Sequence, residues 1–270
     1  MSPPASMIGA RIELLRLHQE LARWRMADRQ ARFWWRDDDA RGSTPRLGRL
    51  LEIAERHHAP LTLAAIPDPA NVELPACLDR APVDLVQHGI DHLNRRSGPA
   101  AGELPHDWPL DRLVAELTRS RAALPPQTAP IFVPPWNDVH PQLPAALSVS
   151  GFTGWSAWPG AAPAEGGPRR IDAHVDLLRW RGGARFRGYG RLLKAFRAAL
   201  ADRRRRGDWN APIGLLTHHL DHDEPAWACL DWFLGRFRTH PAISWRSLKS
   251  LIAEAEPPSI PPFGGQPHSS

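Results

Sequence analysis

Three consecutive carboxylates follow an aromatic run near the start of the chain, in the stretch FWWRDDDARG. Adjacent carboxylates repel one another, so Asp37, Asp38 and Asp39 must either spread into water or be neutralised. A divalent cation would neutralise them, with one aspartate as a ligand and its neighbour free to accept a proton. The competing interpretation is a helix cap or turn with salt bridges to Arg36 and Arg41.

A pair of histidines, His88 and His92, lies four residues apart in the stretch HGIDH, directly after an apolar segment. If this stretch forms a helical loop, both imidazoles point the same way and can bind one divalent cation with a third ligand. A carboxylate from one strand end and two imidazoles from another make an open facial triad, which leaves coordination positions for water and substrate. The sequence therefore predicts a metal site that joins the aspartate run to the histidine pair.

The segments that must position these residues alternate between strand and helix patterns. This alternation predicts an α/β fold with seven or eight strands and right-handed crossovers. We expect a barrel rather than an open doubly wound sheet, because polar residues follow the ends of many different strands. The strand patterns cover residues 31–36, 61–67, 83–87, 131–135, 154–158, 174–180, 212–220 and 243–247, and the helix patterns cover 8–29, 44–58, 110–124, 143–151, 191–204, 225–240 and 248–256.

The length of 270 residues suits one large domain with two short flanking segments. We expect an N-terminal amphipathic helix in residues 1–30, the barrel in 31–256, and an extended or disordered Pro- and Gly-rich tail in 257–270. The stretches 91–109 and 158–172 are rich in Gly, Pro and Ala, which predicts loops or lids over the strand ends.

The charge, the cysteine content and the apolar runs bear on the possible partners and on the cellular compartment. The net charge of +5 includes a run at Arg203–Arg206, which is expected at the solvated end of a helix, so nucleic-acid binding ranks last among the functions considered. Cys77 and Cys229 are too few and too far apart for a disulfide framework or a thiolate metal site, which fits a reducing compartment. No signal-peptide core and no membrane-length apolar run is present, so we expect a cytoplasmic protein without a membrane partner.

Two further strand ends carry polar motifs: IGLLTHHLDHD ends on His218 and His219, and IFVPPWND contains a Pro-Pro-Trp turn. With the acidic run and H-x-x-x-H in the same order, the chain from Phe33 to about His222 resembles the polysaccharide deacetylase family of carbohydrate esterases, which includes chitin deacetylases. The resemblance implies an irregular (β/α) barrel of seven or eight strands. It also implies a metal-dependent reaction that removes an N- or O-acyl group from a sugar.

The resemblance also assigns roles to individual residues. Val133 stands where the family has an arginine and Ala40 where it has a glycine, so Arg36 or Arg179 would have to supply the missing charge. Two choices stay open: a register with Asp37 as base and Asp38 as ligand, and His219 in place of His218. The implied set is Asp39, His88 and His92 as metal ligands, Asp38 as general base, His218 as general acid steadied by Asp176, and Pro135, Trp136 and Trp180 as substrate-binding residues.

The implied cofactor is a divalent metal, most often Zn²⁺, with Co²⁺, Ni²⁺ and Mn²⁺ as alternatives. The expected function is hydrolysis of a carbon–nitrogen bond other than a peptide bond, on an acylated carbohydrate or a small amide. The alternative is a non-catalytic carbohydrate-binding protein on the same barrel, motivated by Val133 and Ala40. Of the twelve tryptophans, Trp136, Trp155, Trp158 and Trp180 follow strand ends, where they either stack on a sugar or pack into the wall.

Overall fold

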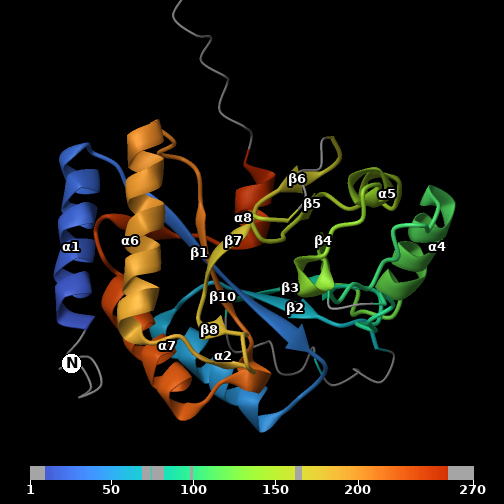
Figure 1. Ribbon diagram of the computed structural model, residues 1–270, viewed down its shortest axis with the longest axis horizontal. Coiled ribbons are helices and arrows are strands. Elements are labelled where there is room, and N and C mark those ends of the chain that lie inside the picture. The colour runs from blue at the N-terminus through green and yellow to red at the C-terminus, as the bar shows by residue number, and fades with distance from the viewer. Residues whose placement is uncertain (1–9, 69–73, 75–81, 98–99, 162–165, 255–270) are drawn as a thin grey trace, which may run out of the picture.

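A curled parallel β-sheet forms the centre of the molecule (Figure 1). This computed structural model describes residues 10–68, 74, 82–97, 100–161 and 166–254, so the expected tail and Cys77 lie outside the described residues. Eight strands follow one another in the order β6-β5-β4-β3-β2-β1-β10-β7, and β11 pairs with the start of β1. The half-barrel confirms the predicted α/β class. Its strands are β1 Ala31–Ala40, β2 Leu61–Ala65, β3 Val83–His88, β4 Ala129–Val133, β5 Gly154–Trp155, β6 Arg169–Arg170, β7 Ala173–Asp176, β10 Ile213–Thr217 and β11 Ile243–Trp245.

Helices cover the outside of this sheet, and their starts follow signals in the sequence. Thr44 caps the helix that Pro45 begins, by accepting a hydrogen bond from the amide of Leu47 at 3.0 Å. Asp223 and Ser247 cap two later helices in the same way. The helices are α1 Arg11–Met26, α2 Pro45–His57, α4 Leu110–Arg121, α5 Leu143–Val149, α6 Tyr189–Arg206, α7 Glu224–Phe237 and α8 Leu248–Ala253, with 3₁₀ turns η2 Pro135–Asn137 and η3 His219–Asp221.

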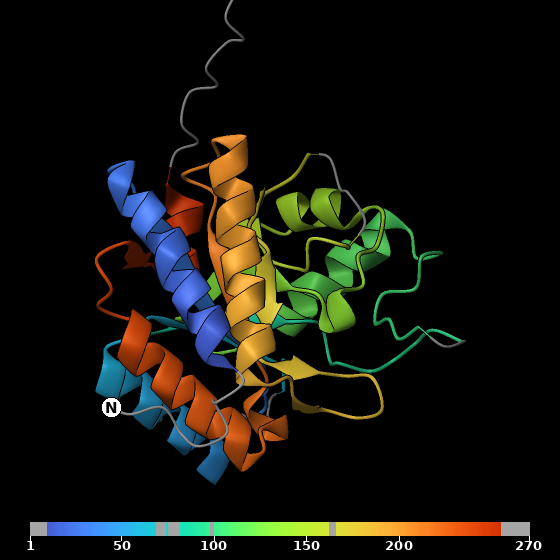
Figure 2. The same ribbon diagram turned by 60° about the vertical axis from the view of Figure 1, so that its left-hand side comes forward.

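The N-terminal helix α1 lies along α6 in both ribbon views (Figures 1 and 2). Leu17 and Trp24 of α1 are buried in the main hydrophobic core. The buried Glu20 accepts a hydrogen bond of 2.6 Å from Arg204, which belongs to the arginine run in the last turn of α6. The predicted helix is therefore present and is packed onto the barrel.

The structure differs from the sequence-based expectation around residues 174–180. This segment is not one strand, because the chain leaves the sheet after β7 and forms an antiparallel hairpin of β8, Leu178–Arg179, with β9, Arg185–Phe186. The side chain of Asp176 accepts a hydrogen bond from the amide of Leu178 at 2.8 Å, which holds the chain at this turn. The expected loop 158–172 also contains β6, which the sequence pattern missed.

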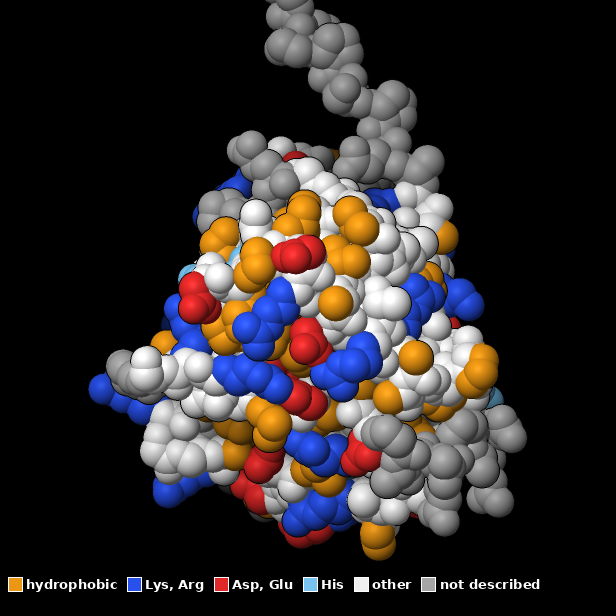
Figure 3. Space-filling view, turned by 90° about the vertical axis from the view of Figure 1, so that its right-hand side faces the viewer, with side chains coloured by type: hydrophobic (Ala, Val, Ile, Leu, Met, Phe, Trp, Pro, Cys, Tyr) orange, Lys and Arg blue, Asp and Glu red, His pale blue; other side chains and the backbone are white. Residues whose placement is uncertain are grey.

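The surface over α4 and α5 carries charges of both signs (Figure 3). Acidic and basic side chains are interspersed on the face over α4 and α5 (Figure 3), where Glu116 and Arg119 form an ion pair. Within the described residues, no helix combines the length and apolar character that crossing a membrane requires.

Candidate functional site

The three adjacent aspartates of β1 have three different sets of partners. Asp37 is completely buried and accepts hydrogen bonds from the hydroxyl of Thr217 at 2.6 Å and from the backbone and ring nitrogens of His219 at 3.0 and 2.5 Å. Neither Asp37 nor His219 lines the cavity that contains Asp38, Asp39 and His218. Asp38, Asp39 and His218 therefore share one cavity, whereas Asp37 and His219 form a separate buried pair.

A bulge in β1 brings Asp39 to the cavity beside Asp38. Regular strand alternation would place Asp39 on the same face as Asp37. The pairing of β1 with β2 shifts register between Asp37 and Ala40, and Asp39 has φ 71°, a left-handed conformation that aspartate tolerates better than most residues. Because the positive φ falls on Asp39 and not on residue 40, Ala40 can stand where the family has glycine.

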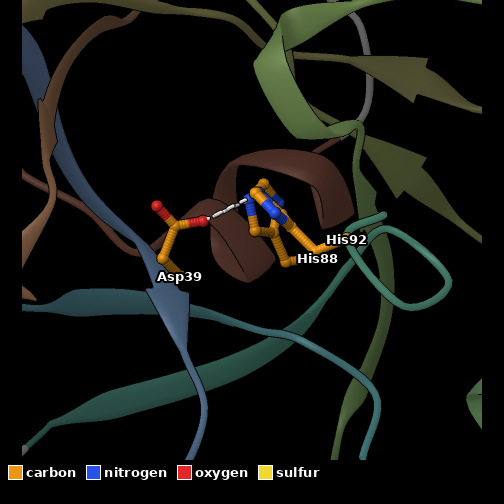
Figure 4. A group of neighbouring side chains, drawn as sticks. All are labelled: Asp39, His88 and His92. Atoms are coloured by element: carbon orange, nitrogen blue, oxygen red, sulfur yellow. Dashed lines mark hydrogen bonds and ion pairs between the residues drawn. The ribbon is translucent and has the colours of Figure 1, made fainter. Parts of the chain in front are cut away.

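Asp39, His88 and His92 form the candidate metal-binding triad. Oδ1 of Asp39 lies 3.1 Å from Nε2 of His88 and 3.0 Å from Nε2 of His92. One potential ligand atom from each residue lies within 4.8 Å of the others. Figure 4 shows the carboxylate reaching from β1 toward the two imidazoles, which come from the end of β3 and the loop after it.

The hydrogen bonds of His88 fit a cation at this point. Nδ1 of His88 lies 3.0 Å from the carbonyl oxygen of Val133, which can only accept, so Nδ1 carries the proton. Without a cation, a protonated Nε2 donates a hydrogen bond to Asp39; a bound cation would instead take the lone pair that Nε2 has in the neutral ring. A backbone carbonyl that orients a ligating histidine in this way is common in metal sites.

The charges of the triad are coupled in the protein itself. Burial acts to raise the pKa of Asp39, but hydrogen bonds from His88 and His92 outweigh it and hold the pKa well below its usual value. Burial acts to lower the pKa of His88, but the negative charges of Asp38 and Asp39 outweigh it and raise the pKa. The site therefore favours positive charge at the point where the three side chains meet.

The loop that carries His92 is not helical, which corrects the sequence-based expectation. The buried carboxylate of Glu103 instead accepts backbone hydrogen bonds from Ile90, Asp91 and His92, at 2.8, 2.9 and 2.5 Å. Gly89 has φ 68°, and a Cβ at this position would lie 2.5 Å from the Glu103 carboxylate. Burial raises the pKa of Glu103. The sequence analysis did not single out Glu103. Its position in the predicted loop 91–109 was the only signal for it, and that signal gives no specific role.

Arg36 pairs with Asp38 and supplies the positive charge that the sequence lacks at Val133. Nε and Nη2 of Arg36 lie 2.9 and 3.0 Å from the two carboxylate oxygens of Asp38. Arg36 is completely buried and also donates a hydrogen bond to the hydroxyl of Ser156 at 2.7 Å. The two residues are neighbours on one face of the strand, so Arg36 fixes the direction of the Asp38 carboxylate. Ser156 was not anticipated from the sequence.

His218 lies at the end of β10 with its Nε2 3.9 Å from Oδ2 of Asp38. Asp176 is buried, and it accepts a hydrogen bond of 2.7 Å from the indole of Trp180, whose ring packs edge-on against His218. Burial raises the pKa of Asp176, and the nearby His218 acts in the opposite direction. Within the described residues, Nδ1 of His218 has no hydrogen-bond partner. The expected proximity of Asp176 to His218 is present, without a direct hydrogen bond between them.

The cavity around these residues has a volume of about 560 Å³, a size typical of small-ligand sites. Trp136 and Trp180 are half exposed at its edge, and Trp158 also lines it. Trp155 is buried in the core and does not line it, and Pro135 is buried beside Gly89 rather than facing the cavity. A larger hollow of about 730 Å³ beside β6 contains none of the candidate catalytic or metal-binding residues.

Comparisons with known proteins agree with this fold. No protein-family model and no curated protein matches the sequence. A putative polysaccharide deacetylase from Mycobacterium smegmatis matches with a TM-score of 0.57 and 15% identity, over 81% of this chain and 88% of that one. A peptidoglycan N-acetylglucosamine deacetylase matches with a TM-score of 0.50 and 14% identity, over 82% and 88% of the two chains.

A mutant of a CE4 family pseudoenzyme with restored enzymatic activity also matches, with a TM-score of 0.50 and 13% identity over 83% of this chain and 68% of that one. At these identities the likeness concerns the fold. The predicted resemblance is confirmed at that level, and the chain has a polysaccharide deacetylase-like fold.

Proposed function

We propose that this protein is a divalent-metal-dependent hydrolase that removes an acetyl or similar acyl group from the amide nitrogen of a sugar or sugar derivative. The observation that carries the proposal is the convergence of Asp39, His88 and His92 beside Asp38 and His218 in one cavity. The deacetylase-like fold supports it, because its solved relatives are described as deacetylases.

The triad would hold the cation. Its two imidazoles and one carboxylate suit Zn²⁺, and Co²⁺, Ni²⁺ or Mn²⁺ are the other candidates. When bound, such a cation polarises an acyl carbonyl and makes water more acidic. The remaining steps belong to the protein side chains and to the shape of the cavity.

Asp38 is placed to accept the proton of the attacking water, because Arg36 holds its carboxylate in a fixed direction at the cavity wall. His218 lines the same cavity, with its Nε2 3.9 Å from Oδ2 of Asp38, and is placed to donate a proton to the leaving nitrogen. Trp136 and Trp180 offer flat apolar surfaces at the cavity edge on which a sugar ring can stack.

Val133 and Ala40, the two departures from the family pattern, do not favour the alternative of a non-catalytic carbohydrate-binding protein. Arg36 takes the place of the arginine missing at Val133, and Ala40 has no positive φ. We also propose a cytoplasmic location. An enzyme in the cytoplasm meets small soluble sugar derivatives rather than wall polymers, so the former are the better candidate substrates.

The test measures bound metal and acetate release from N-acetylated sugars in the wild type, in His88→Ala and in Asp39→Ala. The matched control is His106→Ala, an exposed histidine outside the triad. We expect one metal ion per chain in the wild type and the control, and loss of both metal and acetate release in the other two variants. The proposal fails if the metal-loaded wild type releases no acyl group, or if metal content is unchanged in His88→Ala.

A further inference from the structure

Three arginines line the candidate active-site cavity from one structural element. Arg179, Arg181 and Arg187 belong to the β8–β9 hairpin and the residues that flank its strands. The hairpin projects beside the lower end of α6, in gold in Figure 2. Its turn closes with a hydrogen bond of 3.1 Å from the amide of Gly183 to the carbonyl of Trp180.

The guanidinium groups of these arginines have no direct partner within the described part of the chain, although Asp176 lies close enough to Arg187 for the two charges to interact. None of the three guanidinium groups takes part in an ion pair or a hydrogen bond there, and Arg187 is partly buried. Burial lowers the pKa of Arg187, although the negative charge of Asp176 opposes this. A partly buried cation without a direct partner is unfavourable unless a ligand supplies the counter-charge.

The acids of the cavity are already engaged by other groups. Asp38 is paired with Arg36, and Asp39 lies between two imidazoles. The carboxylate of Asp176 accepts hydrogen bonds from the amide of Leu178 and the indole of Trp180. A neutral acetylated sugar would leave the three guanidinium groups as they are, whereas an oxyanion would satisfy their donors with short, charge-assisted hydrogen bonds.

We propose that this hairpin binds an oxyanion, a carboxylate or a phosphate, carried by the same acylated sugar whose amide is cleaved. The inference rests on the proposed function and names its substrate class: an anionic N-acyl sugar rather than a neutral glycan. The anion would contact Arg187 within the cavity and Arg179 and Arg181 near its mouth, while Trp136 and Trp180 contact the ring.

The test compares acetate release from N-acetylglucosamine, N-acetylglucosamine 1-phosphate and N-acetylmuramic acid. We expect kcat/KM to be about tenfold or more higher for at least one anionic sugar than for the neutral one. The order of the phosphate and the carboxylate distinguishes the two sources of the anion. Added salt should reduce the preference because it screens exposed charges. Equal kcat/KM for all three sugars would overturn the inference.

Variants on the same hairpin locate the effect. Arg187→Gln and Arg179→Gln should each bring the ratio of anionic to neutral kcat/KM toward one. Arg185→Gln is the matched control, because Arg185 pairs with Arg179 across the hairpin, is exposed and does not line the cavity. Loss of the preference in Arg185→Gln to the same extent would contradict the assignment to the cavity-lining arginines.

Calorimetric binding of N-acetylglucosamine 1-phosphate separates this inference from the proposed function. If no acetylated sugar is cleaved but this ligand binds the wild type and not Arg187→Gln, the proposed function fails and the anion site stands. If acetate is released equally from neutral and anionic sugars and the ligand binds both forms equally, the proposed function stands and the anion site fails.

Discussion

At the scale of single residues, the aspartate run combines one structural and two candidate functional positions. The sequence predicted the meeting of Asp39 with His88 and His92, because polar residues at the carboxyl ends of parallel strands gather at one edge of the sheet. It offered Arg36 and Arg179 as alternative sources of positive charge and left the register of the aspartates open, so it did not decide that Arg36 pairs with Asp38 or that Asp37 faces the core. The bulge that brings Asp39 to the cavity is likewise not revealed by the residue types alone.

Replacing Asp38 with asparagine tests its role as proton acceptor. The substitution keeps the size of the side chain but removes its charge and basicity, and it leaves the triad in place. Acetate release should fall by about 10²–10⁴-fold while bound metal stays at the wild-type level. Asp221→Asn, an exposed acid in η3, should change neither quantity. Full activity in Asp38→Asn would remove this residue from the mechanism.

The Asp37–His219 pair predicts a pH-dependent contribution to stability. Burial opposes the charge of Asp37, but His219 and the hydroxyl of Thr217 lower its pKa, so its contribution is present above about pH 3.9 and disappears as pH falls through the lower folded value. Burial acts to lower the pKa of His219, but Asp37 raises it, so that contribution is complete below about pH 6.5 and disappears as pH rises through the folded value.

Both contributions are therefore present between about pH 4 and 6.5. In that window Asp37→Asn should lower the free energy of unfolding by about 3–5 kcal/mol, measured by urea denaturation. The difference from the wild type should shrink as pH rises through the raised pKa of His219, because the ring then loses its charge in the folded protein. A difference that stays the same at every pH from about 5.5 upward would show that the charged pair is not its source.

At the scale of elements, the loop after β3 depends on one buried carboxylate. In Glu103→Gln a single carbonyl oxygen must replace two carboxylate oxygens that accept three backbone amides. His92 should then lose its fixed position, and zinc affinity should fall by about 10–100-fold in a competition titration. Glu116→Gln, on the surface of α4, is the control. Unchanged affinity in Glu103→Gln would exclude this positioning role.

The packing of α1 on α6 predicts a large effect of Trp24, which is completely buried. Trp24→Ala should lower the free energy of unfolding by about 3–5 kcal/mol, because it leaves a cavity in the main core. Ile12→Ala is the matched control on the same helix, since Ile12 is 62% exposed, and it should change stability by at most about 0.5 kcal/mol. Similar effects of the two substitutions in chemical denaturation would mean that α1 is not part of the folded core.

Long helices were predictable, whereas three of the shortest strands were not. The helix patterns at 44–58 and 225–240 lie within a few residues of α2 and α7, because caps and apolar periodicity mark them. Strands β6, β8 and β9 contain two residues each, too few for any periodic pattern. The β8–β9 hairpin, which brings three arginines to the cavity, was missed for this reason.

At the scale of the whole molecule, the order of the strands assembles the site. β1 lies between β2 and β10, so the ends of β1, β3 and β10 open onto one side of the half-barrel. Asp39, His88 and His218 are far apart in the sequence and line the same cavity for this reason. The fold could be predicted from the alternation of patterns, whereas the depth and the charge of the cavity required the three-dimensional arrangement.

The central claim is that one divalent cation binds to Asp39, His88 and His92. Anomalous X-ray diffraction at the zinc absorption edge, from crystals of the zinc-loaded full chain, tests it most directly. We predict one anomalous peak at about 2.0–2.2 Å from a carboxylate oxygen of Asp39 and from Nε2 of both histidines. An anomalous peak only at other residues, or no peak at the triad with zinc in excess, would contradict the account.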